Sequence, residues 1–188
     1  MNHALIIVDM IKDNINFARG SSLDIEASKI IPVINQLATA FRSCSCPVIF
    51  ACDSFMDGDF IFRGRMKPHA IRGTGGDLPI KELDVKSSDL ILPKRRMSAF
   101  HKTDIDQTLR TWGIKTVVVC GIMTNVCVLL TAVDALQNDF NSIIVTDASA
   151  CHKIDVHEMT LKIFENIPLF PLFRLMNSSE VISEISTK

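Results

Sequence analysis

One cysteine lies where a strand-like run of residues gives way to a helix-like run, a position suited to a nucleophile. Residues 116–119 are all β-branched and predict a buried strand, and residues 126–136 lack Gly and Pro and predict an apolar helix. With Thr124 as N-cap, Cys127 falls in the first helical turn, where unpaired N–H groups and the helix dipole stabilise a thiolate. Such a position can lower a cysteine pKa from about 8.5 to about 3.5–7.5. Cys127 is therefore a candidate nucleophile, and the alternative is a cysteine that only fills the core.

Two further reactive side chains follow predicted strands. Asp9 comes directly after the apolar run 3–8, and Lys94 comes directly after the short run 88–93. The carboxyl ends of parallel strands form the binding crevice of an open α/β sheet, so Asp9, Lys94 and Cys127 can point into one crevice. Each has a simpler alternative, because aspartate favours turns and caps and a lysine after a strand is usually exposed.

A long irregular segment, residues 54–79, follows the predicted strand 46–52 and Asp53. It is rich in glycine and carries three arginines and a histidine: Arg63, Arg65, Arg72 and His69. Loops of this length are usually functional or disordered, and an arginine fork suits a carboxylate. We expect a loop that faces the substrate, with a solvated surface as the alternative.

The remaining pattern alternates strands with helices and predicts an α/β fold. Strands are expected at residues 3–8, 46–52, 88–93, 116–119, 142–146 and 167–173, and helices at 23–41, 103–112, 126–138 and 153–166. Pro32 is expected to kink or break its helix, Asp147 to end its strand, and the last, proline-flanked strand to lie at an edge. The polar tail from Asn177 is expected to be partly helical or mobile. We predict a three-layer α/β/α sandwich in a single domain, residues 1–188, without a dinucleotide or P-loop motif.

Composition excludes several classes of protein. The chain has 188 residues, 47% of them hydrophobic, with a formal net charge of -1, which offers no field for nucleic acid. No apolar run reaches eighteen residues and no basic leader precedes the first strand, so we expect a cytoplasmic protein without a membrane partner. The six cysteines form no C-x-x-C pair and are expected to be reduced.

Four motifs resemble those of the isochorismatase-like cysteine hydrolases, which include nicotinamidases, N-carbamoylsarcosine amidases, ureidoacrylate amidohydrolases and isochorismatase. The matching stretches are residues 5–10, 68–78, 92–94 with 98–100, and 121–128. The resemblance covers about the whole chain. It implies a Rossmann-like, six-stranded, mainly parallel sheet of order 3-2-1-4-5-6, a homodimer or homotetramer, and a catalytic triad of Asp9, Lys94 and Cys127.

The resemblance also implies a reaction, usually hydrolysis of a carbon–nitrogen bond. Asp9 would accept the thiol proton, Lys94 would stabilise the thiolate, and Cys127 would attack the carbonyl and form a thioester. The backbone N–H groups of Met123 and Cys127 would form the oxyanion hole, beside a cis peptide between Ile122 and Met123. The expected substrate is a small amide or N-carbamoyl compound, with a carboxylate that Arg63, Arg65 or Arg72 would hold.

The sequence departs from the nicotinamidases at their metal site. Asp53 and His69 match two of the metal ligands of nicotinamidases, but Phe55 replaces a ligand histidine. Two ligands are too few for a closed zinc site, although Asp57 or Asp59 could supply another. We therefore expect a metal-independent amidase that resembles N-carbamoylsarcosine amidase. The alternatives are a nicotinamidase with a partial zinc site, an isochorismatase-type vinyl ether hydrolase and a non-catalytic binding module.

Overall fold

The computed structural model describes residues 2–187 and contains one six-stranded sheet in which every neighbouring pair of strands is parallel. The strand order is β3-β2-β1-β4-β5-β6, which confirms the predicted order. The elements are β1 (His3–Val8), α1 (Ser22–Ser43), β2 (Val48–Asp53), β3 (Leu90–Lys94), α2 (Ile105–Thr111), β4 (Thr116–Ile122), α3 (Leu129–Gln137), β5 (Asn141–Ala150), α4 (Ile154–Glu165), β6 (Phe173–Met176) and α5 (Ser178–Ser186).

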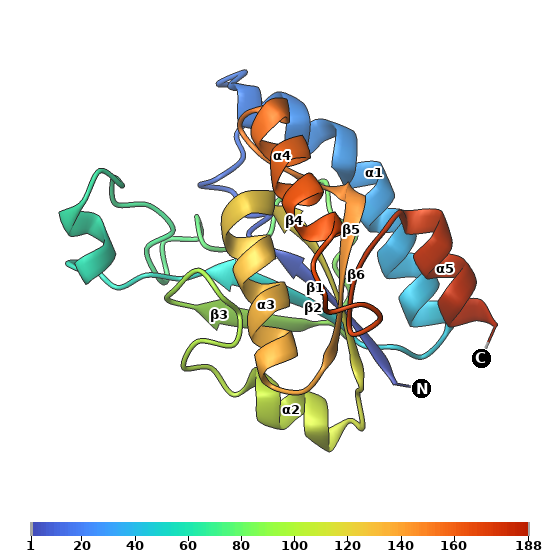
Figure 1. Cartoon of the computed structure of the whole chain (residues 1–188). Helices are drawn as coiled ribbons and strands as arrows, with labels where there is room; N and C mark the ends of the chain where they lie inside the picture. Colours follow the sequence, from blue (N-terminus) through green and yellow to red (C-terminus); the bar gives the residue numbers. More distant parts are fainter. Residues whose placement is uncertain (1, 188) are drawn as a thin grey trace.

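Helices cover both faces of the sheet, as a sandwich requires (Figure 1). Residues of α1 and α5 pack with one set of strand side chains, and residues of α2 and α3 pack with the other set, against which α4 also lies. Alternate residues of β1 belong to the two cores, so all six of its residues are buried. The run without polar alternation at residues 3–8 follows from this burial on both faces.

Gly121 allows β4 to pass close to β1 at the point where β1 ends. Its φ is 110°, and a Cβ there would lie 2.3 Å from the carbonyl oxygen of Val8. A larger residue would therefore push the two strands apart next to Asp9. This close approach lies at the carboxyl end of β1 and β4, the edge at which the predicted reactive residues gather.

The helix α1 runs through Pro32 without the predicted break. Pro32 and Ser28 both lie on the exposed side of α1, whereas Ile30, Ile31 and Ile34 are buried. The carbonyl that loses its helical hydrogen bond can therefore bind water, and burial of the opposite face holds the helix together.

The last two strands differ from the prediction. The strand β5 continues past Asp147, which is not at its end; the Asp147 carboxylate accepts hydrogen bonds of 2.7 Å from the amide and the hydroxyl of Ser178 at the start of α5. Residues 167–172 form turns rather than a strand, and β6 begins at Phe173. Pro168 and Pro171 lack the N–H groups that a ladder needs, so the strand forms only beyond them, and it lies at the sheet edge as predicted.

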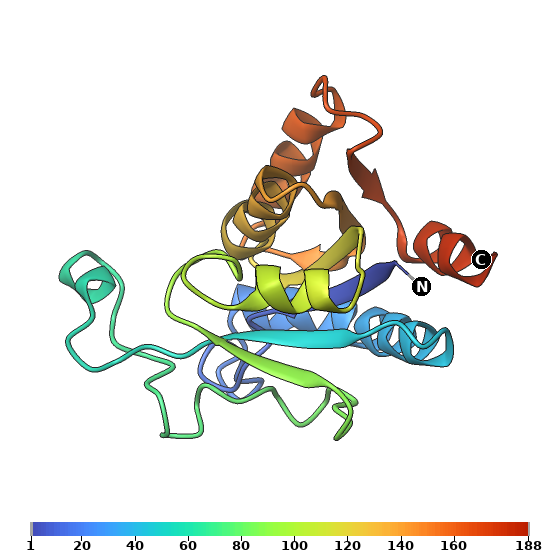
Figure 2. The same ribbon diagram turned by 90° about the horizontal axis from the view of Figure 1, so that it is seen from below.

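Residues 54–79 form an arm that projects from the body of the molecule in both views (Figures 1 and 2). It contains a short 3₁₀ helix, Phe60–Arg63. The arm begins directly after β2 and returns to the body near Asp13, whose carboxylate accepts a 2.7 Å hydrogen bond from the amide of Ala70. It therefore stays anchored beside the carboxyl edge of the sheet.

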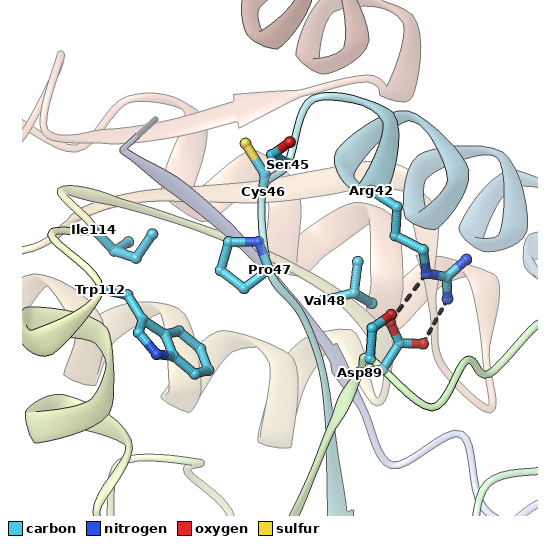
Figure 3. A pocket seen from close by; sticks show the side chains of 9 residues that line it. Arg42, Ser45, Cys46, Pro47, Val48, Asp89, Trp112 and Ile114 are labelled. Carbon is cyan, nitrogen blue, oxygen red and sulfur yellow. Dashed lines mark hydrogen bonds and ion pairs between the residues drawn. The ribbon is translucent and has the colours of Figure 1, made fainter.

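A pocket of about 480 Å³ lies at the opposite, amino-terminal edge of β2 (Figure 3). Pro47, Val48 and Trp112 line it, and the Arg42 guanidinium donates to both carboxylate oxygens of Asp89 at 3.0 and 2.7 Å. None of the predicted catalytic residues lines this pocket. Among the described helices, none is both long and apolar enough to cross a membrane.

Candidate active site

Three charged residues meet where β1, β2 and β3 end. Asp9 follows the last residue of β1, and Asp53 and Lys94 are the last residues of β2 and β3. The parallel register pairs Asp53 with Lys94, so their side chains leave the sheet at the same level. The structure therefore brings together two of the predicted catalytic residues, Asp9 and Lys94, with Asp53 beside them.

Lys94 is a buried cation between two carboxylates. Its side chain is 0% exposed, in contrast to an ordinary lysine at a strand end. The Nζ atom lies 2.7 Å from Asp9 Oδ2 and 2.6 Å from Asp53 Oδ1, and it donates to the carbonyl oxygen of Arg96 at 3.2 Å. All three ammonium protons thus have an acceptor, which is the condition for burying such a charge.

The charged groups of this cluster change one another's pKa values. Burial alone would lower the pKa of Lys94, but Asp9, Cys127 and Asp53 raise it above its ordinary value, so the ammonium stays charged. Burial and the charge of Asp9 raise the pKa of Asp53 to about 7, although Lys94 opposes this rise. Asp53 therefore gains or loses its proton close to neutral pH.

Cys127 lies next to this cluster in a single π-helical turn, Thr124–Val128, that precedes α3. Its Sγ atom and one oxygen each from Asp9 and Asp53 lie within 4.8 Å of one another. Burial and the charge of Asp9 raise the pKa of the Cys127 thiol well above its ordinary value, against the opposing effect of Lys94. This is the opposite direction to the one expected from the helix terminus, because desolvation and two carboxylates outweigh the terminus. The free protein therefore carries a thiol rather than a thiolate.

The turn that carries Cys127 begins earlier than predicted, and Thr124 is not its N-cap. The cap position is Met123, and the peptide between Ile122 and Met123 is cis, as the family resemblance implied. The Thr124 hydroxyl is fully buried and instead makes a 2.8 Å hydrogen bond with Nδ1 of His157 on α4. His157 could not be predicted as part of the site, because nothing in the helical pattern of residues 153–166 relates it to this turn.

A cavity of about 260 Å³ opens on the Sγ side of the cluster. Five residues selected from the sequence line it, and they are Asp9, Asp53, His69, Met123 and Cys127. Most of the others are apolar, namely Leu23, Met66, Met97, Ile122 and Val126, and the polar ones are Asp13, Asn14 and His152. Neither Asn14 nor His152 was predicted to line the site, because both lie in loops without any periodic signal. Asn14 donates a 3.1 Å hydrogen bond to the carbonyl oxygen of Asp9.

The three arginines proposed to bind substrate do not line this cavity. Arg63 lies over the Phe60 ring at 5.7 Å, out on the arm, and Arg65 is exposed. Arg72 donates to the hydroxyl of Ser54 at 3.1 Å and lines a separate cavity. Among the described residues, no arginine or lysine lines the cavity beside Cys127.

The residues present do not fit the metal site of the nicotinamidases. Phe55 is fully buried and packs edge-on against His69, with the ring centroids 5.4 Å apart. The His69 Nδ1 atom lies 2.9 Å from the carbonyl oxygen of Lys67, and Asp53 is bound to Lys94. The group Asp9, Asp53 and Cys127 has the spacing of metal ligands, but the Lys94 ammonium already bridges its two carboxylates.

Asp57 and Asp59, the other two possible metal ligands on the arm, are also poorly placed to bind a metal. Asp57 is exposed and Asp59 is paired with Arg95 at 3.1 Å. Neither lines the cavity beside Cys127. Zinc would therefore have to displace existing hydrogen bonds and ion pairs in order to bind there.

The chain belongs to the isochorismatase family, because an isochorismatase domain matches residues 3–169. It is 32% identical over 165 residues to the uncharacterised isochorismatase family protein YwoC of Bacillus subtilis, covering 85% of this chain and 83% of YwoC. It is 30% identical over 172 residues to the ureidoacrylate amidohydrolase RutB of Methylorubrum extorquens, covering 77% of this chain and 68% of RutB. The family includes hydrolases that act on amides, of which RutB is one. The chain is a hydrolase of the isochorismatase family.

Two solved structures share the fold closely. The N-carbamoylsarcosine amidase of Thermoplasma acidophilum is 31% identical, with a TM-score of 0.81, over 95% of this chain and 97% of that one. The pyrazinamidase of Pyrococcus horikoshii, solved in complex with zinc, is 28% identical with a TM-score of 0.81, over 94% of this chain and 99% of that one. The solved relatives thus include a protein with bound zinc. In this chain Phe55 stands where nicotinamidases have a ligand histidine, and phenylalanine cannot bind a metal.

Proposed function

We propose that this protein hydrolyses the carbon–nitrogen bond of a small, uncharged amide or carbamoyl compound through a thioester on Cys127. The observation that carries the proposal is the buried Lys94 bridge to Asp9 and Asp53 beside the Cys127 thiol. A core cysteine has no need of three charged neighbours, whose burial costs free energy. Charges gathered in a cleft with shifted pKa values are typical of functional sites.

The reaction begins with a proton transfer that the geometry permits. The Cys127 thiol gives its proton to the Asp9 carboxylate as Sγ attacks the carbonyl carbon, and the carbonyl oxygen becomes an oxyanion. Backbone N–H groups of Met123 and Cys127 stabilise this oxyanion, and preorganised donors of this kind contribute about 3–4 kcal/mol each. Lys94 keeps Asp9 in place and balances its charge.

The second half of the reaction returns the proton and frees the enzyme. The tetrahedral intermediate collapses, the carbon–nitrogen bond breaks, and Asp9 gives its proton to the departing nitrogen. Water then attacks the thioester carbon while Asp9 takes a proton from it. Breakage of the carbon–sulfur bond releases the acid, and Asp9 reprotonates Cys127. Because the resting thiol is protonated, Asp9 is needed in every turnover.

The wall of the cavity defines the substrate we propose. Its methionine, leucine and valine side chains suit an apolar group, and Asn14 and His152 supply polar contacts. A carboxylate on the substrate would meet Asp13 and Asp53 rather than an arginine. We therefore favour an uncharged amide over N-carbamoylsarcosine, ureidoacrylate or isochorismate, all of which carry carboxylates.

Nicotinamide is a second specific candidate, because it is uncharged and mostly apolar. In this protein its ring would contact methionine side chains such as Met66, Met97 and Met123 without a metal at the ring nitrogen. Resistance of nicotinamide hydrolysis to a chelator would support this mode of binding. Loss of that activity on chelation would show instead that Asp53 and His69 hold a metal.

The test is ammonia release by the purified protein of known metal content. Substrates are nicotinamide, simple aliphatic and aromatic amides, N-carbamoylsarcosine and ureido acids, with and without a chelator. Cys127→Ala should abolish release, whereas Cys44→Ala, a partly buried cysteine remote from the cavity, should not. Release from carboxylate substrates alone would overturn the neutral-substrate proposal but keep the hydrolase. No release from any of them, by a folded protein, would support a binding module.

A further inference from the structure

A second cavity, of about 280 Å³, lies near the arm and the segment after β3, and its lining is strongly basic. Its wall carries five basic side chains, and these are Arg72, Arg95, Arg96, His101 and Lys102. Arg72 comes from the arm and the others come from residues 95–102. It shares no lining residue with the cavity that contains Cys127.

The positive charge of this cavity is only partly neutralised. Asp59 accepts hydrogen bonds from Arg95 and lies 3.7 Å from Arg96 Nη1. Among the ion pairs of the described residues, Asp59 is the only carboxylate partner of these side chains. Four permanently charged groups therefore face one carboxylate, in a protein whose formal net charge is -1. These side chains are exposed or half-buried, so solvent screens their mutual repulsion, and the excess of positive charge attracts anions to the cavity.

Arg72 has donors that are available to a ligand. Its guanidinium makes hydrogen bonds at 3.1 and 3.4 Å to the hydroxyl and the carbonyl oxygen of Ser54, both uncharged acceptors. No described carboxylate forms an ion pair with Arg72 or with Lys102. An arginine has five N–H donors arranged to match phosphate or carboxylate oxygens, and a lysine adds a mobile point charge.

We propose that this cavity, which we call the basic cavity, binds a small oxyanion with two or more negative charges, such as a phosphate or polycarboxylate group. The volume of about 280 Å³ is near the lower end of the range for small-molecule sites and admits a compact anion. The anion would be held between Arg72 of the arm and the residues 95–102, and it would add to the Asp59–Arg95 ion pair that already joins these two segments.

The basic cavity also adjoins the catalytic cluster through the chain itself. Arg95 and Arg96 directly follow Lys94, and the Arg96 carbonyl oxygen accepts a hydrogen bond from the Lys94 ammonium. An anion that fixes Arg96 would fix this acceptor as well. The site itself stands on the charges and the cavity, and it does not depend on the proposed hydrolysis.

The test measures binding by calorimetry at constant ionic strength, with pyrophosphate and citrate as the probes and chloride as the reference anion. We expect saturable binding of at least one probe, and an affinity at least about tenfold weaker in Arg72→Gln/Lys102→Gln, because the double variant loses two charge-assisted contacts with the anion. Arg65→Gln is the matched control, since Arg65 is an exposed cation of the same arm outside the cavity. It should bind as the unaltered protein does.

The outcomes distinguish the basic cavity from the proposed function. Preference for pyrophosphate would identify a phosphate ligand, and preference for citrate would identify a carboxylate ligand. Absence of saturable binding in the unaltered protein, or equal loss of affinity in Arg65→Gln, would overturn the proposal. A protein that hydrolyses no amide but binds pyrophosphate saturably would refute the proposed function and support the basic cavity.

Discussion

At the scale of single residues, the site depends on burial of charge more than on the helix terminus. Cys127 lies in the first helical turn, yet burial and the charge of Asp9 raise its thiol pKa. The helix terminus acts through partial charges, whereas the Asp9 carboxylate places a whole charge a few ångströms from the thiol. The nucleophile is consequently formed only when its proton moves to Asp9. Asp9 is therefore expected to act as the proton acceptor for Cys127, and a substitution at Asp9 can test this role.

Asp9→Asn should separate thiol reactivity from catalysis. The amide keeps the shape of the side chain but cannot accept the thiol proton, so hydrolysis should fall by about 10²–10⁴-fold. Removal of the negative charge also lowers the Cys127 pKa, so more thiolate exists at pH 8 and alkylation by iodoacetamide should become faster. Mass spectrometry of the alkylated peptide measures this rate. If Asp9 served only to maintain the fold, the loss of hydrolysis would come with a lower urea midpoint and with faster alkylation of all six cysteines, not of Cys127 alone.

Lys94→Gln should show how much the buried bridge contributes to stability. The substitution leaves Asp9 and Asp53 buried without a counter-charge, and breaking such an arrangement costs about 3–5 kcal/mol. Urea unfolding at pH 8 should show this loss. Since protonation of a carboxylate removes its charge, the loss should be smaller at pH 5.5. Lys162 is an exposed lysine of α4 that forms no ion pair with another described residue, so Lys162→Gln is the control and should change stability little.

At the scale of elements, the sequence predicts best where local pattern and tertiary context agree. The strand β1 and the helix α4 appear close to their predicted bounds, because burial on both faces and a helical period both leave clear patterns. The π-helical turn Thr124–Val128 and the extension of β5 past Asp147 leave none. Both depend on contacts with remote elements, through His157 in one case and Ser178 in the other.

In the candidate site, too, residues that follow a local pattern could be predicted and residues placed by remote contacts could not. Asp9, Lys94 and Cys127 could be selected because each follows a strand, and strand ends converge in any parallel sheet. The residues of the cavity wall could not be predicted in this way. Asn14 and His152 come from loops, and the hydrophobic pattern of the sequence does not determine the path of a loop. The arginines of the arm were linked to substrate by their chemistry, but loop geometry places Arg72 in the basic cavity instead.

The contact between α4 and the π-helical turn predicts that His157 is a positioning residue. Burial lowers the pKa of His157, so a neutral imidazole forms the 2.8 Å hydrogen bond with Thr124, three residues before Cys127. His157→Ala should release the turn and lower kcat about tenfold or more, with a smaller change in KM, because a small misplacement of a catalytic group is costly. His157→Asn, whose amide can reach the position of Nδ1, should restore much of kcat. Equal loss in both variants, with normal unfolding, would contradict this role.

At the scale of the whole molecule, the two ends of the described chain meet at the sheet. His3 on β1, Arg174 on β6 and Glu184 on α5 form one group, in which Glu184 bonds Arg174 at 2.7 and 2.9 Å and His3 at 3.1 Å. The group ties a central strand, the edge strand and the last helix together. The bulky side chains Val181 and Ile185 of α5 are buried alongside it. Docking of α5 therefore combines apolar burial with one partly exposed ionic group.

Glu184→Gln should loosen this docking in a manner that depends on pH. The hydrogen bonds from Arg174, aided by His3, lower the pKa of Glu184 from its ordinary 4.5 to about 2 in the folded protein. A lowered carboxyl pKa stabilises the fold above the unfolded value, and this contribution is lost as the pH falls from about 4.5 toward 2. The pair is partly exposed, so solvent screening limits the expected loss to about 1 kcal/mol at pH 7. Urea unfolding at pH 7 and pH 3 should show the difference between variant and parent shrinking at the lower pH. Glu165 is an exposed glutamate that forms no ion pair with another described residue. The stability difference between Glu165→Gln and the parent should therefore be the same at both pH values. A difference as large at pH 3 as at pH 7 would mean that the glutamine disturbs the packing of α5 rather than an ion pair.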